Sequence, residues 1–125
     1  MWTVLETIVT YMLPSIVIDV REYVAADNSI PYRKWFNSLN AQAAAKVAIA
    51  VTWMEQGNLS NTKSVGGGLH ECRVDFGPGY RIYFGRDGDR LVILLGGGTK
   101  KRQQEDIRRA RALWADYKRR KKEES

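Results

Sequence analysis

Hydrophobic and polar residues alternate most regularly in residues 66–101 of the chain. Three short runs there are separated by Gly, Pro and Asp, a pattern typical of antiparallel strands joined by tight turns. In the first two runs, residues 70–76 and 80–84, successive side chains point to opposite faces of a sheet. If the turn keeps the two apolar faces together, the other face carries the polar residues Glu71, Arg73, Asp75, Arg81 and Tyr83.

The third run, residues 91–95, is apolar throughout and predicts a strand that is buried on both faces. Residues 96–99 are three glycines and a threonine, and we expect them to form a flexible loop. Lys100, Lys101 and Arg102 follow directly. The polar face of the sheet is therefore expected to lie beside a cationic loop.

The rest of the chain predicts one further strand and three helices. Residues 16–20 form a short β-run, and apolar residues at spacings of three and four predict a helix over residues 30–39. An alanine-rich segment predicts a second helix over residues 41–56, followed by a loop to residue 68. Residues 102–124 have the pattern of an amphipathic helix. This order predicts an α+β domain, with a helical hairpin on a mostly antiparallel sheet of about four strands and a C-terminal amphipathic helix.

The length of 125 residues fits one domain with a hydrophobic core. We assign residues 16–117 to this domain and residues 118–125 to a basic tail. Residues 1–15 are rather apolar but lack the basic start and the small-residue cleavage site of a signal peptide, so we expect an N-terminal extension. A cytoplasmic protein is expected.

The formal net charge of +6 favours a polyanionic partner: nucleic acid, an anionic membrane surface or an acidic protein. The single cysteine, Cys72, excludes an intramolecular disulfide and a cysteine cluster for zinc. Cys72 and the single histidine, His70, fall on the apolar face, where we expect structural roles. The glycine runs do not match a phosphate-binding loop, and we expect no metal ion and no cofactor.

A resemblance to a known family rests on three parts of the chain. They are the sequence ECRVDFGPGYRIYF at residues 71–84, the strand and glycines at residues 91–98, and Lys100 with the later Asp106-Ile107 pair and Ala110. Together they closely resemble the toxins of the RelE/ParE superfamily, in particular the HigB-like group called addiction module killer proteins. The resemblance covers roughly residues 16–117. It departs from RelE near Ile107, where RelE carries a tyrosine and this chain has none.

The resemblance implies the toxin of a type II toxin–antitoxin system, with a helix-turn-helix antitoxin as its partner. RelE-like and HigB-like members cut messenger RNA on the ribosome, whereas ParE-like members poison DNA gyrase. We expect a ribosome-dependent endoribonuclease that acts on mRNA, with a ParE-like gyrase poison as the alternative. A third possibility is a noncatalytic module that binds nucleic acid or an antitoxin.

Cleavage of RNA by its own 2′-hydroxyl requires proton removal, stabilisation of charge on the phosphate and protonation of the leaving oxygen. Arg73 and Arg81 suit the second task, because a guanidinium binds phosphate through two hydrogen bonds. Neighbouring cations make a lysine easier to deprotonate, so Lys100 is the candidate for proton transfer. Glu71 and Asp75 are expected to hold the arginines in place rather than act as a base.

Three further residues are candidates for binding the RNA substrate. Tyr83 has an aromatic ring of the kind that stacks on unpaired bases. Lys101 and Arg102 place positive charge beside Lys100 and are expected to bind RNA through its phosphates.

Overall fold

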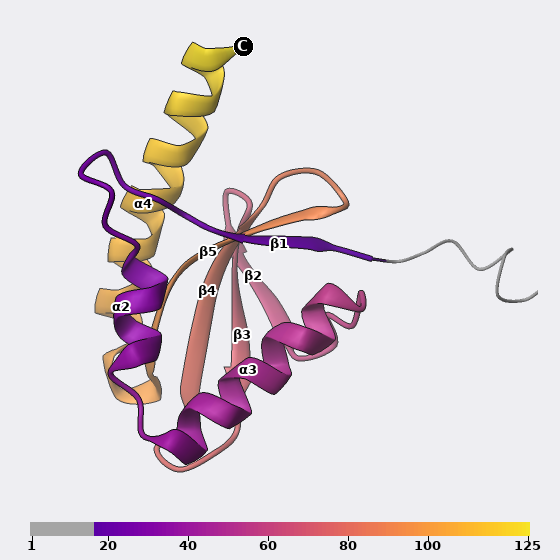
Figure 1. Cartoon of the computed structure of the whole chain (residues 1–125), viewed down its shortest axis with the longest axis vertical. Coiled ribbons are helices and arrows are strands. Elements are labelled where there is room, and N and C mark those ends of the chain that lie inside the picture. The colour runs from indigo at the N-terminus through magenta and orange to yellow at the C-terminus, as the bar shows by residue number, and fades with distance from the viewer. Residues whose placement is uncertain (1–16) are drawn as a thin grey trace, which may run out of the picture.

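The computed structural model describes residues 17–125, so the expected extension at residues 1–15 lies outside the described part (Figure 1). The elements are β1 (Asp19–Glu22), α2 (Pro31–Asn37), α3 (Ala41–Glu55), β2 (Thr62–Gly66), β3 (Leu69–Val74), β4 (Tyr80–Arg86), β5 (Leu91–Thr99), a 3₁₀ turn (Lys100–Arg102) and α4 (Gln103–Glu124). The strands form one five-stranded sheet in the order β1-β5-β4-β3-β2. Within residues 17–125 only the β1–β5 pair is parallel, which confirms an α+β fold with a mostly antiparallel sheet.

The sheet separates two hydrophobic clusters. One lies beneath α2 and α3, and the other beneath α4. Alternate residues of β5 enter the two clusters: Val92 and Leu94 face α2 and α3, while Ile93 and Leu95 face α4. This confirms that residues 91–95 form a strand buried on both faces. In Figure 1, α4 runs along the sheet and its C-terminal end projects beyond it.

The apolar face of the central hairpin also forms as the sequence indicates. Cys72 is buried in the cluster beneath α2 and α3, and burial raises the pKa of its thiol to about 11. His70 stacks on the ring of Phe84, with the ring centroids 5.3 Å apart. Both side chains therefore pack within the fold, in agreement with the structural roles expected for them.

Two edge strands differ from the sequence prediction. The predicted loop at residues 58–68 contains β2, which pairs with β3 and brings the sheet to five strands rather than about four. The first strand is Asp19–Glu22 rather than residues 16–20, and the backbone N–H of Ile18 donates to the carbonyl oxygen of Glu55 instead. Both strands are rich in polar residues because they lie at the edges of the sheet, so they show little of the alternation that marks a half-buried strand.

The predicted flexible loop at residues 96–99 is wrong, because these residues continue β5 and pair with β4. A Cβ on Gly97 would lie 2.4 Å from the ring of Trp35, and a Cβ on Gly98 would lie 1.9 Å from Asp106 Oδ2. The glycines therefore allow two side chains to pack directly on the strand backbone. Close packing, rather than flexibility, explains their presence.

The helices lie where the sequence predicts them, with small shifts at their ends. Helix α2 begins at Pro31, whose fixed φ suits the first position of a helix, and ends two residues before the predicted limit. Helix α3 begins after Asn40, whose side chain accepts a hydrogen bond from the backbone N–H of Ala43. The residues assigned to a basic tail continue α4 as far as Glu124.

Candidate active site at the end of the sheet

The register of the central hairpin brings the two predicted arginines together. Arg73 of β3 lies directly opposite Arg81 of β4, and Glu71 lies opposite Tyr83. Directly opposite residues of an antiparallel pair project from the same face, here the face covered by α4. The side chain of Arg73 is 50% exposed, whereas Arg81 is only 5% exposed.

Lys100 lies at the same corner of the sheet. Its backbone N–H donates to the carbonyl oxygen of Gly79, at 2.9 Å. Gly79 has a φ of +80°, which favours glycine, and a Cβ built there would lie 3.6 Å from Lys100 Cβ and 3.7 Å from Arg81 Nη1. The tight turn before β4 thus places the predicted lysine beside the buried arginine.

Lys101 and Arg102 extend the positive charge beyond this corner. Both are exposed, and both lie in the 3₁₀ turn that links β5 to α4. Arg102 forms an ion pair with Glu105, at 3.1 Å. The turn therefore presents two further cations to solvent directly after Lys100.

Glu71 is fully buried and connects α4 to the sheet. Its Oε2 accepts a hydrogen bond of 2.7 Å from Gln103 Nε2, and its Oε1 lies 3.9 Å from Arg73 Nε. The positioning role expected of Glu71 stays a prediction: Arg73 is its nearest cation, and within residues 17–125 the buried Oε1 has no hydrogen-bond partner. Asp75, the other carboxylate assigned to that role, is exposed beyond the end of β3.

Arg81 carries a buried charge with few partners. Its Nη1 donates to the carbonyl oxygen of Tyr80 at 3.0 Å, and its Nε has no hydrogen-bond partner. Within residues 17–125 it forms no ion pair with a carboxylate. A buried cation without a counter-charge is costly, so this site is suited to receiving an anion.

Tyr83 lies on the same face, but its ring is only 1% exposed beneath α4. Its hydroxyl is buried and has no hydrogen-bond partner. Burial raises its pKa, and the nearby carboxylates Glu71 and Asp106 raise it further. The hydroxyl therefore stays protonated and is available as a hydrogen-bond donor.

Asp106 is a buried polar residue to which the sequence reasoning assigned no role. It is 8% exposed, packs against Gly98 and lies 3.7 Å from Arg109 Nη1. The signal was present in the sequence, because Asp106, Ala110 and Trp114 follow one another at intervals of four on the buried face of α4. A carboxylate within such an apolar stripe indicates a buried charge.

Burial raises the pKa of Asp106, although Arg102 and Arg109 act in the opposite direction. The folded chain then holds this proton more tightly than the unfolded chain. The resulting stabilisation is present below the ordinary carboxyl pKa of about 4 and is lost as the pH rises through the raised value. We expect the free energy of unfolding of the wild type, relative to Asp106→Asn, to fall as the pH rises from about 4 through the raised pKa.

Urea unfolding of both proteins across this pH range measures the difference. Hydrogen bonds lower the pKa values of Asp87 and Asp116 in both proteins alike. Their contributions therefore cancel in the difference between the two free energies of unfolding. A difference that stays constant or grows with pH would contradict the raised pKa.

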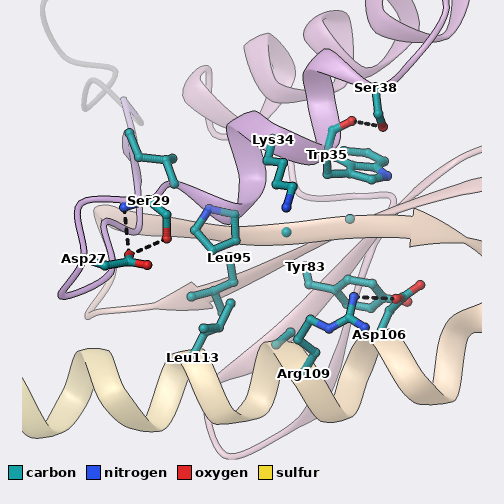
Figure 2. Close-up of a pocket in the computed structure, with 15 residues that line it drawn as sticks. Asp27, Ser29, Lys34, Trp35, Ser38, Tyr83, Leu95, Asp106, Arg109 and Leu113 are labelled. Carbon is teal, nitrogen blue, oxygen red and sulfur yellow. Dashed lines mark hydrogen bonds and ion pairs between the residues drawn. The ribbon is translucent and has the colours of Figure 1, made fainter.

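A cleft of about 620 Å³ lies between α2 and α4, next to these residues. Figure 2 shows Lys34 on α2 and Arg109 on α4 at opposite walls, with Trp35, Tyr83 and Asp106 at one end. Leu95, Gly96 and Gly97 of β5 also line the cleft. Tyr83 and Asp106 therefore belong both to the face that carries the arginines and to the cleft.

No helix in residues 17–125 is long and apolar enough to cross a membrane. A family model described as "Phage derived protein Gp49-like (DUF891)" matches residues 34–115, which include α3, the central strands and most of α4. An uncharacterized protein of Haemophilus influenzae is 38% identical over 86 residues, which cover 68% of this chain and 87% of that protein. The matched region contains both arginines, Lys100 and Asp106. The chain belongs to the Gp49-like family of phage-derived proteins.

Proposed function

We propose that this protein is the toxin of a type II toxin–antitoxin system and that it blocks translation by cutting messenger RNA on the ribosome. The observation that carries the proposal is the pairing of Arg73 with Arg81 on one face of the sheet, with Lys100 at the same corner. Three cations around one turn suit a phosphodiester. The resemblance of residues 71–84 to RelE-like toxins adds the reaction class.

In this reaction the 2′-oxygen of the RNA attacks the adjacent phosphorus and the 5′-oxygen leaves. The products are a 2′,3′-cyclic phosphate and a 5′-hydroxyl, so no water and no metal ion enters the balance. Negative charge grows on the two non-bridging oxygens during the attack. Arg81, which lacks a carboxylate partner, and the half-exposed Arg73 stabilise that charge.

The two proton transfers need a group that can reach both the 2′-oxygen and the 5′-oxygen. Lys100 is exposed and lies beside Arg81, so it is our candidate for at least one transfer. Glu71 is held by Gln103 and Arg73 and serves to position the arginine. Lys101 and Arg102 bind the RNA backbone on either side of the reacting phosphate.

The proposed partners are the ribosome with its mRNA and a helix-turn-helix antitoxin. The positive face around Arg73 and Lys100 suits an acidic or amphipathic segment of the antitoxin. A gene for such an antitoxin next to the gene of this protein would support the assignment.

Induced expression in bacteria tests the proposal. We expect growth arrest together with new 5′ ends inside translated messages, mapped by primer extension, and no cuts in a reporter message whose start codon has been removed. Growth arrest with intact messages, an SOS response and cleaved DNA–gyrase complexes would instead establish a gyrase poison. Normal growth at high expression would leave only a noncatalytic binding module.

A further inference from the structure

The cleft between α2 and α4 exists because β1 ends before β5 does. Strand β1 pairs with Leu91–Leu94 of β5, whereas β5 continues to Thr99 with β4 as its only partner strand among the described residues. The register of β5 against β4 shifts between Leu94 and Gly96, which marks a β-bulge. Beyond this point one edge of β5 lies without a neighbouring strand, and it forms part of the cleft lining between the two helices.

The cleft combines apolar walls with a few polar groups, a combination that suits a heterocyclic base. Trp35 provides an aromatic surface and Leu95 an apolar one. The buried hydroxyl of Tyr83 has no partner, and the buried carboxylate of Asp106 lies at the same end of the cleft. Apolar walls with a few fixed polar groups are typical of small-ligand sites.

The rim of the cleft is cationic on both sides. Lys34 points toward β5 from α2 (Figure 2). Arg109 lines the cleft from α4, where its Nη1 lies 3.7 Å from Asp106 Oδ1 and its Nη2 lies 3.5 Å from Glu105 Oε1. A phosphate held between Lys34 and Arg109 would leave its base free to enter the cleft. The net charge of +6 strengthens attraction of an anionic chain to this edge.

We propose that this cleft binds one nucleotide of single-stranded RNA, with its base against Trp35, guanine favoured by the carboxylate of Asp106, and its phosphate between Lys34 and Arg109. The inference rests on the proposed function and adds a subsite for a base beside the reacting phosphate. The N1–H and the N2 amino group of guanine are adjacent donors, and one carboxylate accepts from both. Adenine has no such pair of donors.

The cleft adjoins the proposed site of cleavage through two residues. Tyr83 lies two positions along β4 from Arg81, on the same face. Asp106 packs on Gly98, which pairs with Arg81 from the other side. A nucleotide in the cleft and a phosphate at the arginines are thus near enough to belong to one RNA strand.

Gly96 offers a substitution that blocks the cleft and spares the fold. Its φ lies outside the left-handed region, and a Cβ built there meets no atom within 4 Å. The alternation along β5, with Gly97 against Trp35 and Gly98 against Asp106, directs that Cβ toward α4 and into the cleft. Gly96→Leu therefore fills the cleft, and Ala45→Leu adds the same side chain to the exposed surface of α3 as a control.

Fluorescence anisotropy with the full chain and the pentaribonucleotides UUGUU and UUAUU tests the inference. We expect the wild type and Ala45→Leu to bind UUGUU more tightly than UUAUU. Gly96→Leu should weaken binding of UUGUU at least about tenfold without lowering the melting temperature. Asp106→Asn, which replaces one acceptor by a donor, should remove the preference for guanine.

Equal binding of both oligonucleotides by the wild type and Gly96→Leu would overturn the inference. So would a Gly96→Leu protein that binds RNA normally and fails to bind the antitoxin, since the cleft would then be a peptide site. Message cleavage on ribosomes, measured in parallel, keeps the two proposals separate. If Gly96→Leu cuts messages at the wild-type rate and positions, the nuclease proposal stands and the base site is contradicted. If RNA binding depends on the cleft but messages stay intact, the base site stands and the nuclease proposal is contradicted.

Discussion

Replacing Arg81 with alanine should reduce cleavage of translated messages at least about 100-fold, because loss of one preorganised donor to a transition-state anion has effects of this size. Growth arrest on induction should disappear with it. The guanidinium is enclosed beside Lys100 and has no carboxylate partner in the described part of the chain, so its positive charge is available to an anionic ligand. Primer extension on ribosomes with purified protein measures the rate.

Two further variants separate catalysis from folding. Arg81→Lys keeps the charge and loses the planar pair of donors, so it should recover only part of the activity. Arg90→Ala removes an exposed arginine from the turn between β4 and β5, at the other end of the hairpin, and should cut at the wild-type rate. Full activity of a folded Arg81→Ala protein would remove Arg81 from the mechanism.

Replacing Trp114 with alanine should lower the free energy of unfolding by about 3–5 kcal/mol, a large part of the stability of a domain this size. The indole is 4% exposed and packs so closely on β4 that a Cβ at Gly85 would lie 2.2 Å from its ring. It also donates from Nε1 to the carbonyl oxygen of Gly67 at 2.9 Å and stacks on Tyr117. Its loss leaves a cavity between α4 and the sheet.

Trp53→Ala is the matched control, because this indole lies on α3 and is 46% exposed. We expect it to change the free energy of unfolding by less than about 1 kcal/mol. Urea unfolding followed by circular dichroism compares the two variants with the wild type. Similar effects of the two substitutions would show that α4 does not depend on Trp114 for its attachment.

Most of the fold could be predicted from the sequence, because most elements bury one regular face. The central hairpin alternates over residues 70–84, and α4 repeats Asp106, Ala110 and Trp114 at helical spacing. The prediction is wrong for segments in which buried and exposed residues do not alternate regularly. Strands β1 and β2 lie at the two edges of the sheet, and the glycines at the end of β5 are explained by Trp35 and Asp106, which are distant in sequence.

The residues of the candidate site could be predicted from the sequence, but their burial and their contacts with the helices could not. Alternation along two strands sufficed to place Arg73 and Arg81 on one face. It could not show that Arg81 is buried, that Gln103 binds Glu71 or that α2 contributes Lys34 to the same region, because these depend on how the helices pack. The proposed base site likewise depends on how α2 and α4 pack at the edge of β5.

The parallel pairing of β1 with β5 joins Asp19 to Leu91 and so connects two segments that are far apart in the sequence. Strand β1 leaves the ribosome early and must wait for its partner, and α4, which covers the arginine face, is synthesised after that. Contacts between residues so distant in sequence form slowly. A nascent chain of this protein therefore leaves the arginine face of the sheet uncovered until α4 has been synthesised.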